Sequence, residues 1–416
     1  MSKARPRKPL PRNVWVLGFV SLLMDLSSEI YHALLPLFIT VTLGLPATVL
    51  GAIDGISEAT ASFAKLASGR LSDGTRRRKP WILAGYGIAA LSKPLFPVAT
   101  GGAELMGARF ADRLGKGIRG GPRDAMIADE TAPDARGRAF GLRQSLDTIG
   151  AVVAPLAAVG LMVLLAGNIR AVFWIAVIPA MLSFLLAWLA LREPAAPHAG
   201  RRSAAFFAGF RELDRPTRRL IAVGFLFTLA RFSEGFLILR GFDVGLSATL
   251  SPLVLVLFNL AFFALAYPAG AFSDRFSPKT ILMAGMAVLI AADLILAQPL
   301  GLPGLGVGVA LWGAHMALTQ GIFARLIADA APPHLRATSF GAFHFVGGIA
   351  TLLASLGAGL IWERHGPEAV FIAGAAVAAV AMAMLSLLPE TKDPPCREAM
   401  GRGTGEAGGG VTETGN

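Results

Sequence analysis

The sequence contains few charged residues for its length. Only 16% of its 416 residues are Asp, Glu, Lys or Arg, whereas 54% are hydrophobic, and the mean hydropathy is +0.60. A soluble globular domain usually carries about 25% charged residues, because its surface must face water. The shortage of charge therefore excludes an ordinary soluble protein and indicates that lipid surrounds most of the chain.

Cysteine is scarcer still. The single cysteine, Cys396, lies in the polar C-terminal tail, so an intramolecular disulfide and a cysteine-based metal site are excluded. No His-x-x-x-His spacing indicates a metal site either, and we expect no bound metal or cofactor. The net charge of +11 does not indicate nucleic acid, because most Lys and Arg residues stand in short segments between apolar runs, where they orient a membrane protein.

Long apolar runs occupy nearly the whole chain. A bilayer core of roughly 30 Å takes about 20 apolar residues per helix, so about twelve helices with short connections account for this length. The run after Val14 is too long for a secretory signal and carries Asp25 and Glu29, so we predict that it is the first membrane helix. The predicted helices lie near 13–40, 47–69, 81–99, 103–130, 138–166, 171–191, 218–240, 249–271, 280–298, 304–330, 338–362 and 368–389.

These helices fall into two halves joined by a polar segment. The predicted parts are a cytoplasmic basic N-terminus at 1–12, an N-terminal six-helix bundle at 13–191, a cytoplasmic linker at 192–217, a C-terminal six-helix bundle at 218–389 and a disordered cytoplasmic tail at 390–416. In this order the cytoplasmic loops carry roughly two dozen Lys and Arg residues, against about three outside. The bias predicts a multi-pass protein of the cell inner (plasma) membrane with both termini in the cytoplasm.

An internal repeat relates the two halves. The segment IADETAPDARGRAFG from Ile127 recurs as IADAAPPHLRATSFG from Ile327. At nearly the same offset, GRLSDGTRRRK from Gly69 recurs as GAFSDRFSPK from Gly270. Two matched halves that pivot about a site between them are the architecture of alternating access.

The segment GRLSDGTRRRKP at 69–80 resembles the signature of the major facilitator superfamily between its second and third helices, although Gly74 stands where the family usually has Arg. The resemblance covers about residues 13–389. It implies an all-α integral membrane fold of twelve transmembrane helices in two pseudo-symmetric six-helix bundles. The residues that it implies as a latch on the cytoplasmic gate are Gly69, Asp73, Arg77, Gly270 and Asp274.

The predicted fourth helix carries more charge than a lipid-exposed helix tolerates. At about 100° per residue its charged side chains fall within an arc of about 120°, so they must face protein or water. They are Arg109, Asp112, Arg113, Lys116, Arg119 and Arg123. Arg113 with Gly117 resembles the Arg-x-x-x-Gly motif of the superfamily, which implies a part in proton transfer. Lys116 and Arg119, nearest the predicted midpoint, are candidates for substrate binding.

Three ionisable residues of the predicted first helix share one face. Asp25, Glu29 and His32 lie within about 60° of one another, and the family architecture would place them opposite the basic stripe of the fourth helix. A carboxylate exchanged between an arginine and a proton would couple transport to a proton gradient, so Asp25, Glu29 and Arg113 are candidates for proton coupling. His32 is a candidate for substrate binding. The alternative is a static network of ion pairs between helices.

The predicted fifth helix resembles the motif of the twelve-helix proton-driven antiporter branch. Gly141, Gly150 and Pro155 carry the resemblance, although Ala154 replaces a glycine of the motif. Small residues let membrane helices pack closely, and a proline lets them bend. The resemblance implies export in exchange for protons.

The second half offers fewer ionisable residues. Those that we assign to the substrate site are Glu234, His315 and Gln320, with packing as the alternative for a lone histidine such as His315. In the first half the basic residues of the predicted helices slightly outnumber the acids. This excess favours an anionic or zwitterionic substrate.

These patterns predict a secondary active transporter, not an enzyme, that moves a small organic solute across the inner membrane by proton-coupled alternating access, with export favoured. The alternatives are a proton symporter for uptake of an anionic metabolite or a metal chelate, and a polytopic membrane enzyme. Neither a DDxxD nor an HxxxxD pattern supports the enzyme. We expect a monomer whose partners are its substrate, protons and the lipid bilayer.

Overall fold

The computed structural model describes residues 9–75, 77–132, 135–193, 213–273, 276–319, 322–331 and 336–388. Nearly all of them are helical, and no strand occurs among them. The elements of the first half are α1 (Arg12–Leu37), the π-helix η1 (Phe38–Thr42), α2 (Ala47–Thr75), α3 (Lys79–Ser92), α4 (Leu95–Val98), α5 (Gly102–Glu130), α6 (Arg136–Leu164) and α7 (Ile169–Ala190). Those of the second half are α8 (Arg215–Leu229), α9 (Gly235–Asp243), α10 (Leu253–Ser273), α11 (Pro278–Leu296), α12 (Gly301–Thr319), α13 (Ile322–Ala330), α14 (Arg336–His365) and α15 (Pro367–Ser386).

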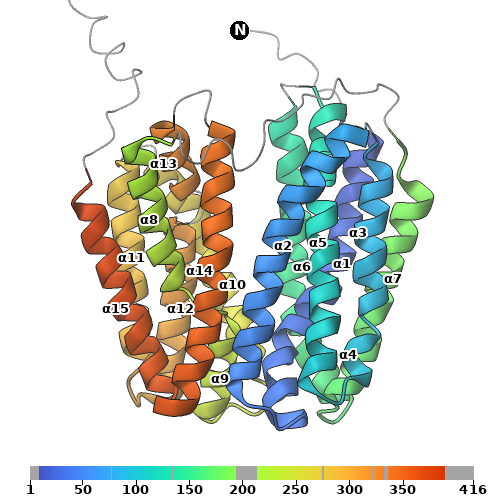
Figure 1. Cartoon of the computed structure of the whole chain (residues 1–416). Coiled ribbons are helices and arrows are strands. Elements are labelled where there is room, and N and C mark those ends of the chain that lie inside the picture. The colour runs from blue at the N-terminus through green and yellow to red at the C-terminus, as the bar shows by residue number, and fades with distance from the viewer. Residues whose placement is uncertain are drawn as a thin grey trace, which may run out of the picture.

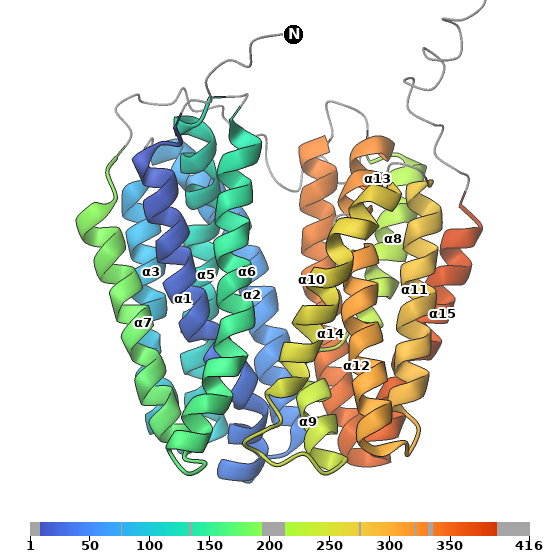
Figure 2. The ribbon, with the colours of Figure 1, turned by 180° about the vertical axis from the view of Figure 1, so that it is seen from behind.

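The helices form two bundles that stand side by side (Figure 1). Helices α1 to α7 make up the first bundle and α8 to α15 the second, and the view from behind shows the same division (Figure 2). Each predicted apolar run corresponds to one helix or to consecutive helices: α1 with η1, α3 with α4, and α8 with α9. The run 304–330 covers α12 and α13, between which residues 320–321 lie outside the described residues.

Eight helical segments of the described residues are long and apolar enough to cross a membrane. They are Arg12–Thr42, Lys79–Val98, Arg136–Leu164, Ile169–Ala190, Pro278–Leu296, Gly301–Thr319, Gly341–His365 and Pro367–Ser386. Helices α2 and α5 are as long but carry several charged residues. Large apolar side chains such as Trp188 and Phe263 are more than half exposed, which suits contact with lipid.

The prediction of one unbroken helix at 218–240 is wrong. Helix α8 ends at Leu229 and α9 begins only at Gly235. The Ser233 hydroxyl accepts a hydrogen bond from the Gly235 backbone N–H at 3.1 Å. A serine side chain that bonds to a nearby backbone group competes with the helical pattern, and this interaction stabilises the unwound segment 230–234.

The predicted helix at 81–99 is also interrupted. Helix α3 ends at Ser92, and α4 begins at Leu95 after Pro94. Lys93 keeps helical dihedral angles, but Pro94 has no backbone N–H to donate to the Ala90 carbonyl, so the helical hydrogen-bond pattern is interrupted at residues 93–94.

Direct backbone contact between α2 and α14 joins the bundles at one end of the molecule. A Cβ atom at Gly51 would overlap the carbonyl oxygen of Ser355, and a Cβ at Gly359 would lie 2.7 Å from the Thr48 Cα. Glu363 Oε1 accepts a hydrogen bond from the Thr48 backbone N–H at 2.7 Å. We call this end, where α2 begins and α14 ends, the closed end.

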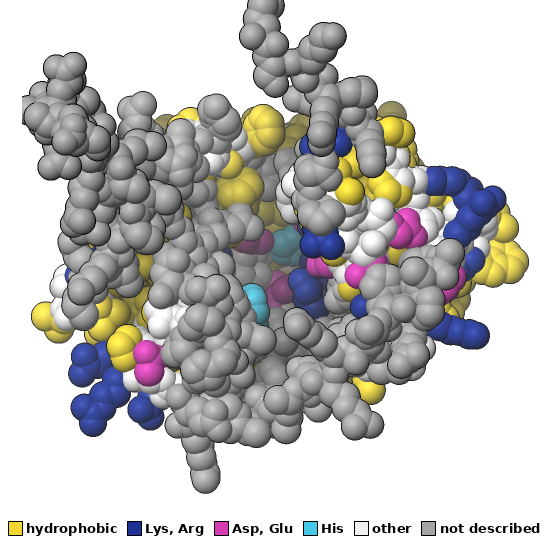
Figure 3. Space-filling model, turned by 90° about the horizontal axis from the view of Figure 1, so that it is seen from above, with side chains coloured by type: hydrophobic (Ala, Val, Ile, Leu, Met, Phe, Trp, Pro, Cys, Tyr) yellow, Lys and Arg dark blue, Asp and Glu magenta, His cyan; other side chains and the backbone are white. Residues whose placement is uncertain are grey.

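The opposite end, where α1 and α6 begin, is the open end. Seen from this side, the molecule is hollowed between the bundles, and acidic, basic and histidine side chains lie within the hollow (Figure 3). The described structure is therefore closed at one end and open at the other.

Parts of the predicted domain division lie outside the described residues. These are most of the basic N-terminus, the linker between Glu193 and Leu213, and the whole tail after Leu388. Their assignment stays a prediction.

Candidate functional site

Two cavities that share Glu29 and Lys116 lie between the bundles. The central cavity has a volume of about 520 Å³ and the side cavity about 310 Å³. The charged or histidine side chains around the central cavity are Glu29, His32, Asp54, Glu58, Arg109, Arg113, Lys116, Arg231 and Glu234. Those around the side cavity are Asp25, Glu29, Lys65, Lys116, Arg119, Arg123, Arg143 and Asp147. Both cavities are therefore built for polar and charged ligands.

His32 of α1 stands between two carboxylates from different bundles. Its Nδ1 lies 3.3 Å from Glu29 Oε2, one turn earlier on α1. Its Nε2 lies 4.0 Å from Glu234 Oε2, at the end of the unwound segment that precedes α9. Three residues that the sequence assigned to proton coupling or substrate binding thus meet in one row across the central cavity.

Arg113 of α5 contacts acids of its own bundle. Its Nη1 lies 3.1 Å from Glu58 Oε1 of α2, and its Nε lies 3.9 Å from Asp112 Oδ2. The sequence placed Arg113 opposite Asp25 and Glu29, but its direct partner is Glu58. Because Glu58 is partly exposed to the central cavity, this ion pair borders the space where a ligand would bind.

Lys93 is a buried cation that the sequence analysis missed. Its side chain is fully buried at the break between α3 and α4. Its Nζ lies 2.9 Å from Asp112 Oδ1, donates to the Ser28 hydroxyl and sits 4.9 Å from the centre of the Tyr31 ring. A lysine next to a proline inside an apolar run was the available signal, because membrane burial of a charge requires a partner.

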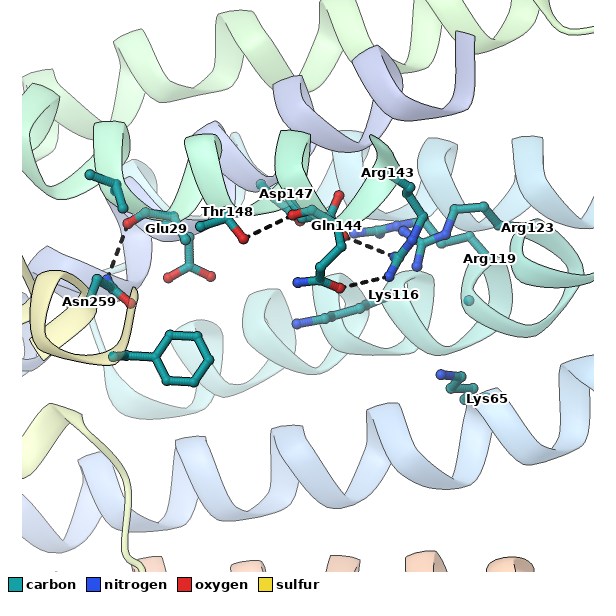
Figure 4. A pocket seen from close by; sticks show the side chains of 15 residues that line it. Glu29, Lys65, Lys116, Arg119, Arg123, Arg143, Gln144, Asp147, Thr148 and Asn259 are labelled. Carbon is teal, nitrogen blue, oxygen red and sulfur yellow. Dashed lines mark hydrogen bonds and ion pairs between the residues drawn. The ribbon is translucent and has the colours of Figure 1, made fainter. Parts of the chain in front are cut away.

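Lys116 and Arg119 have no carboxylate within ion-pair distance in the described part of the chain. Lys116 is exposed to the cavities (Figure 4), whereas Arg119 is 3% exposed and stacks its guanidinium 4.6 Å from the centre of the Tyr86 ring. Their positive charges are therefore available to an anionic group. This arrangement agrees with their assignment as candidate substrate ligands.

The side cavity is bordered by α1, α2, α5 and α6 of the first bundle and by α10 of the second. Arg143 Nη1 lies 2.9 Å from Asp147 Oδ2 on α6. Asn259 of α10 donates a hydrogen bond to the Ala151 carbonyl of α6 at 3.3 Å, which links the bundles (Figure 4). Figure 4 also shows Lys116 extended into the space that Glu29 and Asn259 border.

The antiporter-like residues of α6 differ in their surroundings. A Cβ at Gly150 would lie 3.3 Å from the Asp25 Cβ, so this glycine permits close approach of α1 and α6 beside a candidate coupling residue. Pro155 is buried inside α6, and Gly141 faces open space. Close packing at Gly150 is thus present, whereas Gly141 has no comparable neighbour.

The predicted gate is described only in part. A Cβ at Gly121 of α5 would lie 2.9 Å from the Gly69 Cα, so α2 and α5 approach closely at this point. Arg77 is exposed in the connection between α2 and α3. For Asp73 and Gly270 the structure describes the backbone but not the surroundings of the residue. Asp274 and Gln320 lie outside the described residues. The roles predicted for these four residues stay predictions.

His315 lies behind the cavity wall. The side chain is fully buried, and its ring meets the Trp312 ring edge-on at 4.8 Å. Trp312 borders the central cavity, but His315 itself does not. Substrate binding by His315 stays a prediction, and its position agrees with the packing alternative.

A sequence model of the Major Facilitator Superfamily matches residues 17–355 and, in a second match, residues 236–407. The chain belongs to the major facilitator superfamily. A curated relative within it, an uncharacterized MFS-type transporter of Methanocaldococcus jannaschii, is 29% identical over 384 residues, which cover 91% of this chain and 95% of the relative.

Solved structures of superfamily transporters share the fold. A mutant of the nucleoside transporter NupG matches with a TM-score of 0.78 and 15% identity over 90% of this chain and 100% of its own. A POT family transporter in complex with a thioalcohol-conjugated peptide matches with a TM-score of 0.77 and 12% identity over 91% of this chain and 98% of its own. The predicted membrane fold is therefore confirmed, and this member of the superfamily is a transporter rather than an enzyme.

Proposed function

We propose that this superfamily member is a proton-coupled secondary transporter that exports a small anionic or zwitterionic organic solute across the inner membrane. The observation that carries the proposal is the row Glu29, His32 and Glu234, which joins the two bundles within the central cavity. An ionisable group that bridges two moving bodies couples its protonation to their movement.

In this proposal, protons bind to the row and the substrate binds directly beside it. A proton that binds to Glu29 or Glu234 removes the negative charge that attracts a protonated His32, and so weakens the link between the bundles. Glu29 also borders the same two cavities as Lys116. An anionic group of the substrate that contacts Lys116 would therefore change the electrostatic potential at Glu29, which a bound proton also changes.

Export is the direction that we favour, on the resemblance of α6 to the antiporter motif and on the close approach of Gly150 to Asp25. Proton-driven uptake of an anionic metabolite or a metal chelate is the second candidate. The availability of Lys116 and Arg119 as cations supports an anionic ligand in either direction.

Orientation follows from the distribution of charge along the sequence. The excess of Lys and Arg in the loops at the open end favours a cytoplasmic position for this end and for both termini. In this orientation the cavities face the cytoplasm, where a substrate for export would enter. We expect the transporter to work as a monomer.

The test is transport of a library of organic solutes into inverted membrane vesicles with an imposed proton gradient. We expect gradient-dependent accumulation of at least one solute by the wild type and its loss in Glu29→Gln and in Arg113→Ala. Matched controls are Glu104→Gln and Arg218→Ala, whose side chains are exposed and border neither cavity. Accumulation that survives collapse of the gradient, or wild-type behaviour of both cavity variants, would contradict the proposal.

A further inference from the structure

Asp293 of α11 is a buried carboxyl group with one unused oxygen. The residue is fully buried, and Trp312 of α12 donates its indole N–H to Asp293 Oδ1 at 2.9 Å. Asp293 Oδ2 has no hydrogen-bond partner in the described part of the structure. Buried polar atoms are almost always hydrogen-bonded, so this oxygen requires an explanation.

The surroundings of Oδ2 provide an acceptor rather than a donor. A Cβ placed on Gly374 of α15 would lie 2.8 Å from Asp293 Oδ2 and 3.3 Å from the carbonyl oxygen of Ala230. The two oxygens thus face the same small space beside this glycine. Neither a carboxylate nor a carbonyl can donate a hydrogen bond, whereas a protonated carboxyl has an O–H that can.

Among the described residues, no cation compensates a charge on Asp293. Within the described residues no Lys, Arg or His forms an ion pair with it. Helices α12 and α15 both pack against α11. The ionisable residue of α12 is His315, which lies behind Trp312. The ionisable residue of α15 is Glu368, which pairs with Arg240 at the closed end. The described side chains of α10 include no carboxylate, Lys, Arg or His, and the side chains of Arg325 and Asp329 on α13 lie outside the described residues. An ionised Asp293 would hold an unpaired charge inside the membrane, which is costly.

Asp293 is nevertheless connected to the central cavity at two points. Trp312, its hydrogen-bond donor, borders that cavity. The unwound segment 230–234 begins at Ala230 and carries Arg231, Ser233 and Glu234 into the cavity lining. A change of charge at Asp293 therefore acts on both the Trp312 ring and the segment that holds Glu234.

We infer that Asp293 is a second proton-carrying residue of the transporter, located in the second bundle. In the conformation described here, which is open at one end, Asp293 Oδ2 holds the proton. When segment 230–234 shifts and admits water, Oδ2 releases the proton to that water and Oδ1 keeps the Trp312 N–H. The inference rests on the proposed proton-coupled transport and adds a site that lies outside the cavity-lining charges.

The functional test uses the purified transporter in vesicles. Asp293→Asn is nearly isosteric and still accepts the Trp312 hydrogen bond, but it cannot bind or release a proton. We expect this variant to retain counterflow of substrate without a gradient, to lose gradient-driven accumulation, and to lose a step of the wild-type pH profile. Asp243→Asn, at the exposed end of α9, is the matched control and should behave as the wild type. Wild-type accumulation and an unchanged pH profile in Asp293→Asn would overturn the inference.

Infrared spectroscopy of the purified protein separates this inference from the proposed function. We expect a carbonyl stretch of a protonated carboxyl that shifts in heavy water and is absent from Asp293→Asn. Trp312→Phe, a second variant in case the first does not fold, should retain the band at a changed frequency because Oδ1 loses its donor. Absence of the band in the wild type overturns the inference even if transport is proton-driven. A band that disappears at high pH in a wild type without gradient-dependent transport contradicts the proposed function but supports proton binding by Asp293.

Discussion

Ser233 in the second bundle donates a hydrogen bond to Asp54 Oδ2 in the first bundle at 2.5 Å. Asp54 Oδ1 lies 3.6 Å from Arg109 Nη2, so the same carboxylate also faces the basic stripe of α5. The contact lies in the central cavity. It therefore links the charges of the candidate site to the contact between the bundles.

Loss of this hydrogen bond should favour opening of the closed end. A hydrogen bond to a charged group contributes about 1.5–3 kcal/mol, so Ser233→Ala should raise the population of the oppositely open state roughly tenfold or more. The measurement is labelling of Ser355→Cys, in a Cys396→Ser background, by a membrane-impermeant thiol reagent added from the closed-end side. Ser386→Ala removes an exposed hydroxyl that bonds only within its own helix, and it serves as the control. An equal labelling rate in Ser233→Ala and Ser386→Ala would show that the bond does not hold the closed end.

Glycine packing between α2 and α14 yields a second prediction. Gly51→Ala places a Cβ against the Ser355 carbonyl, and overpacking of this kind costs about 1–3 kcal/mol. We expect this variant to resist closure of this end and to slow substrate counterflow. Gly357→Ala adds the same methyl group to α14 in open space, and its counterflow should equal that of the wild type. The prediction is wrong if both variants exchange substrate at the wild-type rate.

The buried pair of Lys93 and Asp112 should stabilise the first bundle. Removal of one partner of a buried ion pair typically costs about 3–5 kcal/mol, and we expect the lower end of this range for Lys93→Met because Arg109 and Arg113 also face Asp112. Lys65→Met removes a mostly exposed ammonium 3.7 Å from Asp124 and should cost about 1 kcal/mol or less. Thermal unfolding in detergent compares the two. Equal melting temperatures would mean that the Lys93 contacts contribute no more than a surface pair.

Lys116 and Arg119 should determine the affinity for an anionic substrate. Loss of a charge-assisted contact weakens binding by about 1.5–3 kcal/mol, so Lys116→Gln should raise the dissociation constant roughly tenfold or more. Arg119→Lys keeps the positive charge but loses the planar stacking on Tyr86, and a smaller weakening is expected. Equilibrium binding to the purified protein measures both effects. Arg218→Gln, whose exposed side chain borders neither cavity, is the control, and equal affinities of Lys116→Gln and this control would exclude a direct contact with Lys116.

The positions of the helices could be predicted because apolar runs of membrane length have few other solutions. The charged arc of α5 could be placed on the protein interior for the same reason, since Arg113 and Lys116 would not tolerate lipid. The breaks were not predicted from hydropathy: residues 220–230 and 235–239 are both apolar, so the run 218–240 resembles one helix, yet Ser233 and Gly235 unwind it between them through a local hydrogen bond. Local side-chain geometry decides such breaks, and a count of apolar residues does not record it.

The pairings within the site required the tertiary structure. Helical periodicity places Glu29 and His32 on one face of α1, but only the packing of the two bundles brings Glu234 to His32 and assigns Glu58 to Arg113. Asp293 was overlooked because a single carboxylate in an apolar run carries no periodic signal, and its donor Trp312 belongs to another helix.

The sequence by itself determined that the chain lies in a membrane, folds into helices in two related halves, and turns its charged side chains toward the interior. The reason is that the free energy of placing a polar group in lipid depends on the residue itself and not on residues far away along the chain. Only the tertiary structure decided which end is closed, which charges pair across the interface, and that Asp293 Oδ2 has no hydrogen-bond partner among the described residues. Those features depend on distances between helices that are far apart along the chain, and on the few ångströms of space that Gly51, Gly150 and Gly374 leave between them.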